Sequence, residues 1–165
     1  MTIRELVKYP DPRLHQDCEL VTKFDGELSQ LLDDMFETMY QADGIGLAAP
    51  QIGVLQRITV IDVSSDGEEQ FALINPEIIE KTGSVSSEEG CLSIPGYRDT
   101  LKRSEQVTVR AQDRTGEVFE LAADGLLAIC LQHEIDHLHG VLFTDKLSRL
   151  KKEFFKRWFK KNEPL

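Results

Sequence analysis

The sequence predicts an α+β fold in which mainly antiparallel strands pack around a central helix, with a further helix at the C-terminal end. One helical pattern comes first, several strand patterns follow it, and helical patterns return over the last 40 residues. Strand segments that follow one another without helices between them are typical of antiparallel sheets. The central helix carries the pattern His-Glu-x-x-His.

The first elements are a short helical turn at Asp11-Pro12 and an amphipathic helix over residues 27–41. In the second segment the apolar residues recur at helical spacing, so one face is expected to join the core. Residues 56–63 alternate and are rich in β-formers, which predicts a strand.

Residues 71–80 predict a second strand, interrupted at Asn75-Pro76. Residues 106–111 and 118–121 flank a turn at residues 113–116 and therefore predict a hairpin. Asp124-Gly125 then supplies a capping residue and a breaker, and residues 126–131 form an apolar run that ends at the motif. Gly140 is the expected stop signal, so this helix is predicted to be buried.

The motif places His133 and His137 four residues apart with Glu134 between them. Residues i and i+4 lie on one face of a helix, so both imidazoles can reach a single metal ion. The glutamate beside them can take a proton from a water molecule that the metal activates. Two core histidines satisfied by hydrogen bonds are the alternative, but a buried helix with a further ligand available favours the metal site.

The third ligand is not fixed by the motif itself. A downstream histidine, known from one extended motif, is replaced here by Phe143, and His139 points to a different helix face. The downstream glutamates, Glu153 and Glu163, lie in a basic tail. Two cysteines remain as candidates.

Cys91 is the favoured third ligand, because it lies in a Glu-Gly-Cys-Leu context that predicts a loop or strand end. Cysteine with two histidines, and water in the fourth position, is a known catalytic set. Cys130 is the rival, one turn before His133, but a ligand from the same helix turn gives poor tetrahedral geometry. We interpret Cys130 as a pocket wall residue and Cys18 as an unrelated thiol.

Residues 44–53 form a third notable segment, GIGLAAPQIG. Glycines there allow backbone to approach a ligand closely. Gln51 is the polar side chain of the run and can donate a hydrogen bond to an oxygen that gains charge. Taken alone, the segment favours a plain Gly-rich turn.

Together, GIGLAAPQIG, EGCLSIPG and QHEIDH resemble the three signature motifs of bacterial peptide deformylases, in their order, spacing and chain length. The resemblance covers residues 1–147 and implies removal of the formyl group from the N-terminal formyl-methionine of nascent polypeptides, with release of formate. It implies Fe²⁺ as the metal, with Zn²⁺, Ni²⁺ or Co²⁺ as substitutes. The implied metal ligands are Cys91, His133 and His137.

The resemblance also implies the other roles. Glu134 is the general base and acid, while Gln51 and the backbone N–H of Leu92 form the oxyanion site. We expect substrate contacts from an apolar methionine pocket, from glycine backbone and from one arginine; these residues are Ile45, Gly46, Glu89, Gly90, Arg98, Ile129, Cys130 and His133.

Composition predicts one soluble domain of 165 residues in a reducing compartment, the cytoplasm. No apolar run approaches the ~20 residues that a membrane span needs, and residues 1–5 lack the apolar core of a signal peptide. Three cysteines do not indicate a disulfide framework. We expect a monomer that does not bind membranes.

Charge is unevenly distributed along the chain. Residues 1–145 hold 11 basic and 27 acidic residues, whereas residues 146–165 hold 8 and 2. We therefore predict a catalytic domain over residues 1–147 and a basic amphipathic helix over residues 148–165. That helix either packs its apolar stripe on the body or docks on an anionic surface. In related bacterial deformylases such a helix contacts the ribosome, and this use is kept as one of two alternatives.

Two other functions stay open from the residues alone. A zinc endopeptidase shares the His-Glu-x-x-His pattern but needs a downstream ligand that is missing here. A structural-metal module that binds RNA or the ribosome would suit the basic tail, but a structural site usually has four protein ligands. Three are evident, which favours catalysis.

Overall fold

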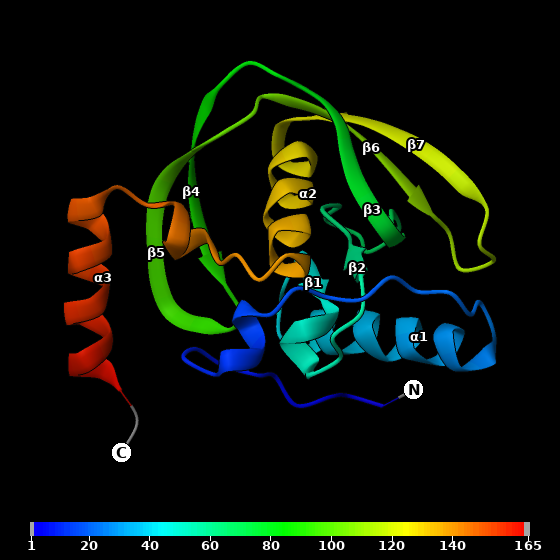
Figure 1. Cartoon of the computed structure of the whole chain (residues 1–165), viewed down its shortest axis with the longest axis horizontal. Coiled ribbons are helices and arrows are strands. Elements are labelled where there is room, and N and C mark those ends of the chain that lie inside the picture. The colour runs from blue at the N-terminus through cyan, green and yellow to red at the C-terminus, as the bar shows by residue number, and fades with distance from the viewer. Residues whose placement is uncertain (1, 164–165) are drawn as a thin grey trace.

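The computed structural model describes residues 2–163, so residues 1, 164 and 165 of the expected domain and tail lie outside the described part. Helix α2 lies at the centre of the molecule, between a two-stranded and a five-stranded sheet (Figure 1). The predicted α+β class with a central motif helix and a C-terminal helix is confirmed.

Three α-helices and three short 3-10 helices are present among the described residues. They are η1 (Pro12–His15), α1 (Gly26–Gln41), η2 (Ala49–Ile52), α2 (Gly125–Leu138), η3 (Phe143–Lys146) and α3 (Arg149–Asn162). The strands are β1 (Gly46–Ala48), β2 (Ile58–Ile61), β3 (Phe71–Thr82), β4 (Val85–Cys91), β5 (Ile94–Arg103), β6 (Gln106–Gln112) and β7 (Val118–Asp124).

The larger sheet has the order β1-β2-β3-β6-β7, and each neighbouring pair is antiparallel. The predicted interruption at Asn75 is a bulge inside one continuous strand, where the pairing with β6 shifts between Ile74 and Glu77. Asn75 has a φ of 52°, a left-handed conformation that asparagine tolerates better than most residues. Its side chain bonds both the N–H and the carbonyl of Val21, which ties the N-terminal segment to the sheet.

Strands β4 and β5 form a separate hairpin that the sequence analysis did not predict as a sheet. Strand β4 is rich in serine and glutamate, and neither β4 nor β5 has the β-branched alternation of the other strands. The hairpin lies on the other side of α2 from the larger sheet (Figure 1). Cys91 lies at the end of β4, as expected for a strand end.

Helix α2 begins after Asp124 and ends before His139, and Gly140 follows with a φ of 75°. The start and stop signals were therefore predicted correctly, although the Asp124 side chain makes no capping hydrogen bond. The Gly-rich segment is more ordered than a plain turn, since it forms β1 and η2 and its residues 46–51 are buried.

Three apolar clusters hold these elements together. One joins α1 to β1 and β2, a second joins α2 to β2, β3 and β6, and a third lies around η3, β5 and α3. None of the helices within residues 2–163 is long and apolar enough to cross a bilayer.

The tail forms the predicted helix, but its apolar residues do not make one stripe. Leu147 and Phe155 are buried, and Trp158 and Phe159 pack against the third cluster. Leu150 and Phe154 instead are 67% and 54% exposed. The helix therefore packs on the body and also presents apolar groups to solvent, so the two alternatives from sequence do not exclude each other.

Candidate metal-dependent active site

A cleft of about 570 Å³ lies where β1, the β4–β5 hairpin and α2 meet. It gathers nearly all of the predicted site residues, although they come from three distant stretches of the chain. Those that line it are Ile45, Gly46, Gln51, Glu89, Gly90, Cys91, Leu92, Arg98, Ile129, Cys130, His133 and Glu134. His137 is 1% exposed and lies beneath the cleft surface.

Three ligating atoms converge beside the cleft. The Nε2 atoms of His133 and His137 are 3.2 Å apart, and the Cys91 Sγ lies 3.4 Å from the His137 Nε2. The ligating atoms of all three residues lie within 4.8 Å of one another, which fits one cation bound at the centre of the group. Burial and the neighbouring His133 keep the pKa of His137 well below its usual value, so its nitrogen is available as a ligand.

Cys130 is placed differently from its rival. Its Sγ lies 3.8 Å from the Ile45 carbonyl oxygen, at the wall of the cleft. Cys18 is buried beside Ala48 and Leu138, in a small apolar cluster of its own. Among the described residues, Cys91 is the cysteine grouped with the two histidines, as the sequence analysis favoured.

Glu89 has a contact that sequence reasoning missed. Its Oε1 lies 2.9 Å from the His133 Nδ1, and both of its oxygens accept bonds from Arg103 at 2.8 Å. Burial alone would raise the pKa of Glu89, but the bonds from Arg103 and His133 lower it to about 2. An ionised carboxylate accepts the Nδ1–H of His133, which leaves the Nε2 lone pair for a cation.

Arg103 extends this network to the motif helix. Its Nη1 donates to the Asp136 Oδ2 at 2.7 Å, and its side chain is 2% exposed. Asp136 is the residue just before His137 in the motif, and Arg103 lies at the end of β5. One buried guanidinium therefore fixes both the hairpin and α2 relative to the metal ligands. The sequence did not indicate this contact, because Arg103 lies 14 residues from Glu89 and 33 residues from Asp136.

Glu134 is buried and has an unsatisfied oxygen. It is 4% exposed, and its Oε1 has no hydrogen-bond partner among the described residues. Burial raises its pKa to about 7. A Cβ on Gly46 would lie 2.6 Å from the Glu134 Oε2, so only glycine lets the β1 backbone approach this carboxyl so closely. A carboxyl with a pKa near neutrality is suited to accept and return a proton.

Gln51 is oriented by its own backbone neighbourhood. Its Oε1 accepts from the Ala48 N–H at 2.9 Å, which leaves its Nε2 facing the hairpin. The Nε2 lies 3.2 Å from the Ser93 Oγ and 3.5 Å from the Cys91 Sγ. The amide N–H groups thus point to the region beside the metal ligands. Ser93, fully buried, is a second contact that sequence reasoning did not identify.

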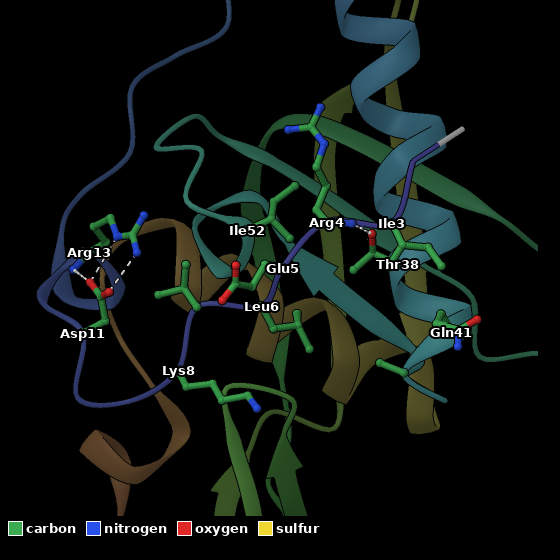
Figure 2. Close-up of a pocket in the computed structure, with 12 residues that line it drawn as sticks. Ile3, Arg4, Glu5, Leu6, Lys8, Asp11, Arg13, Thr38, Gln41 and Ile52 are labelled. Carbon is green, nitrogen blue, oxygen red and sulfur yellow. Dashed lines mark hydrogen bonds and ion pairs between the residues drawn. The ribbon is translucent and has the colours of Figure 1, made fainter. Parts of the chain in front are cut away.

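A second hollow, of about 800 Å³, lies between the N-terminal segment, the end of α1 and Ile52 (Figure 2). Its described lining residues include neither cysteine nor histidine. Two of its cations are already paired, Arg13 with Asp11 and Arg4 with Asp34, both at 2.9 Å. The groups suited to catalysis therefore lie in the first cleft.

Two further residues considered in the sequence analysis, His139 and Arg98, lie away from the ligand group. His139 caps the end of α2 and pairs with Asp17 at 3.1 Å, away from the ligand group, as expected. Arg98 lines the cleft mouth and pairs with Glu88 at 3.0 Å.

A converging cysteine and two histidines, a buried glutamate whose pKa is raised to about 7, and an amide donor beside them are the groups that a metal-dependent hydrolase requires. The model of the family described as polypeptide deformylase matches residues 3–153. The chain belongs to this polypeptide deformylase family.

Individual relatives agree over nearly the whole chain. A peptide deformylase of Chromobacterium violaceum is 53% identical over 163 residues, which are 99% of this chain and 98% of that protein. The crystal structure of a peptide deformylase from Legionella pneumophila has a TM-score of 0.93 at 52% identity, covering 98% of this chain and 95% of that one. A peptide deformylase from Ehrlichia chaffeensis in complex with actinonin has a TM-score of 0.93 at 41% identity, covering 100% of both chains.

Members of this family remove the formyl group from nascent polypeptides in a metal-dependent hydrolysis, and this is the activity of the chain. The zinc endopeptidase and the structural-metal RNA-binding module, both open from sequence alone, find no support in these comparisons.

Proposed function

We propose that Cys91, His133 and His137 hold the catalytic cation and that Glu134 moves the protons of deformylation. The observation that carries this proposal is the placement of a buried carboxyl with an unpaired oxygen beside three converging ligand atoms. One position of a tetrahedral site is left for a water molecule or the substrate.

The cation we propose is Fe²⁺, with Zn²⁺, Ni²⁺ or Co²⁺ able to take its place. A thiolate with two imidazoles suits each of these ions, and the family resemblance favours iron. When bound, the cation supplies Lewis acidity to the reaction.

The remaining chemistry belongs to the side chains. Glu134 accepts a proton from the attacking water at its carboxylate and later gives a proton to the leaving amine. Gln51 Nε2 and the Leu92 N–H donate to the oxyanion, and a donor of this kind typically contributes about 3 kcal/mol. Gln51 is held for this role by the Ala48 N–H. Because a formyl carbon bears only hydrogen, a tight site can exclude larger acyl groups.

The substrate contacts follow the shape of the cleft. Ile45, Ile129, Cys130 and the His133 ring provide an apolar wall for the methionine side chain. Gly46, Gly90 and the Glu89 backbone lie close enough to the cleft to grip an extended peptide, with Arg98 at its mouth.

Formate release from a formyl-methionyl peptide tests the proposal, with the acetylated peptide as the matched control. Glu134→Gln should keep the stoichiometric metal content of the parent and lose ~10²–10⁴-fold in turnover. Near-normal turnover of this variant would remove Glu134 from the mechanism, and loss of metal would make it a ligand instead.

We also propose a cytoplasmic monomer in which residues 1–147 perform the chemistry and α3 docks on the ribosome. Leu150 and Phe154 lie four residues apart, so they share a helix face, and both are exposed. Eight basic residues surround them between residues 146 and 161. This surface suits a partner that is anionic and partly apolar, such as ribosomal RNA and protein.

The docking surface is tested by Leu150→Ser with Phe154→Ser, which leaves the packed residues Phe155, Trp158 and Phe159 unchanged. Ribosome pull-down should weaken, and the parent's binding should fall steeply between 50 and 200 mM salt, as counterion release requires. Equal, salt-insensitive binding by both proteins would end the docking proposal. Sedimentation of the parent tests the monomer.

A further inference from the structure

The β4–β5 hairpin carries part of the active site but belongs to no larger sheet. Among the described residues, β4 and β5 pair only with each other. A two-stranded hairpin is marginal by itself, so its position depends on what packs against it. The hairpin holds Cys91 at the end of β4, while Gly96, Tyr97 and Arg98 at the start of β5 line the cleft.

Helix α3 packs on this stretch of β5. The rings of Trp158 and Phe155 each lie with their centroids 4.9 Å from that of Tyr97. A Cβ at Gly96, whose φ is 84°, would come within 3.6 Å of the Trp158 ring. Figure 1 shows α3 running beside β5. The same two residues therefore face the cleft and meet the C-terminal helix.

Polar contacts also fix α3 against β5. The Lys151 Nζ donates to the Thr100 carbonyl at 2.7 Å, and the Tyr97 hydroxyl donates to the Asp99 Oδ2 at 3.0 Å. Burial, with that hydrogen bond, raises the pKa of Tyr97 to about 12, so the phenol stays a donor. Tyr97 is thus fixed at its hydroxyl and on its ring.

Gly96 and Tyr97 form one wall of the cleft, and the position of this wall indicates which part of the substrate it contacts. Cys91, His133 and Glu134 lie at the deep end, where the formyl group must react. Gly96 and Arg98 are exposed, so they lie at the mouth. The peptide beyond its first residue leaves the site through that mouth.

We propose that α3 completes the substrate cleft, with Trp158 as the positioning residue for the Gly96–Tyr97 wall that receives the peptide beyond formyl-methionine. This inference rests on the proposed placement of the reacting formyl group. It gives α3 a role within the enzyme that differs from docking, because Trp158 packs on Tyr97 whereas Phe154, one turn earlier in the helix, is 54% exposed.

The test compares Trp158→Ala with the parent on two substrates, formyl-methionine amide and a formyl-methionyl tetrapeptide. KM for the tetrapeptide should rise about three- to ten-fold, the range that one aromatic contact is worth. KM for the short amide and kcat for both should stay within about two-fold. Trp158→Phe should restore the tetrapeptide KM, and Phe154→Ala on the same helix should leave it unchanged.

Two further variants separate a change in substrate binding from a loss of folding. Trp158→Leu keeps apolar volume if the alanine variant folds poorly, and Tyr97→Ala should reproduce the same selective rise in KM. Equal changes for both substrates, or a fall in kcat that follows melting temperature, would reduce Trp158 to a structural residue and overturn the inference. Absence of formate release by the parent would instead overturn the proposed function, so the two failures are distinct.

Discussion

Cys91 and Cys130 both line the cleft, and their surroundings differ. Cys91 comes from a strand end and meets the His137 Nε2 at 3.4 Å, whereas the Cys130 Sγ lies by the Ile45 carbonyl. Burial, followed by the charges of Glu134 and Glu89, raises the pKa of Cys130 well above its usual value. A thiol that resists ionisation is a poor ligand, because metals bind the thiolate.

We therefore expect Cys91→Ala to lose its metal and Cys130→Ala to keep it. Metal content per chain after gel filtration measures the difference. Cys130→Ala should also retain measurable deformylation, since it changes only the pocket wall. Retention of stoichiometric metal by Cys91→Ala would mean that the ligand set is wrong.

The pH dependence of activity follows from Glu134. Its pKa is raised by burial to about 7, so its base form is lost as the pH falls through that value. A bound cation lowers the pKa of a nearby carboxyl, which moves the midpoint below 7. We expect kcat/KM to fall about ten-fold per pH unit on the acid side of this midpoint and to level off above it. A profile measured from pH 5 to 9 that stays flat would contradict the assignment.

Single residues were predictable from sequence where one local pattern carried the chemistry. The two histidines, Glu134 and Cys91 follow from spacing and from neighbours in the chain. The role of the Glu89 side chain did not, because its partners Arg103 and His133 lie 14 and 44 residues away. No local pattern distinguishes a carboxylate that orients a ligand from one on the surface.

Among the elements, the hairpin was the largest that the sequence did not indicate, and the short β1, η2 and η3 were not predicted either. Strand β4 contains serine and glutamate, and β5 contains proline, glycine and charged residues, where β2 and β6 contain valine and isoleucine, so the local β propensity is weak. The hairpin holds its place through long-range contacts, with Arg103 bound to Glu89 across the hairpin and to Asp136 on α2. The elements with clear periodicity, α1, α2 and the β6–β7 pair, were predicted within a few residues.

Arg103→Gln should therefore destabilise the fold far more than an ordinary surface change. It removes both guanidinium bonds to the buried Glu89 carboxylate and leaves His133 as its partner, and loss of one member of a buried ion pair typically costs about 3–5 kcal/mol. Arg98→Gln in the same strand is the matched control, because Arg98 and Glu88 are 61% and 66% exposed and such a pair is worth at most about 1 kcal/mol. Urea denaturation of the metal-free proteins measures both. Similar midpoints for the two variants would show that the buried network does not stabilise the fold.

At the scale of the whole molecule, α3 has two faces with different environments. Composition predicted a basic amphipathic helix correctly but could not assign its apolar residues, because Phe154 and Phe155 are adjacent and equally apolar. The structure separates them: Phe155 is 4% exposed and Phe154 is 54% exposed. Which of two neighbours is buried depends on the register of α3 against β5, and Tyr9 and Tyr97 set that register from distant parts of the chain.

This adjacency offers a direct comparison of stability. Phe155→Ala opens a cavity in the third cluster and should cost about 3–5 kcal/mol, which corresponds to roughly 10 °C in melting temperature for a chain of this size. Phe154→Ala should shift the melting temperature by no more than a degree or two. Thermal melts of the two variants beside the parent decide the matter, and equal shifts would mean that α3 does not pack as described.

The separation of charge between body and tail also has an electrical consequence. Residues 1–145 carry a net charge of −16 and residues 146–165 carry +6, so the molecule is a strong dipole with α3 at its positive end. Near a polyanion such a particle turns before it makes contact, and the torque acts within the Debye length, about 8 Å at physiological ionic strength. Because α3 packs beside the strand that forms the cleft mouth, the turn that brings the helix to an anionic surface also brings the mouth near that surface.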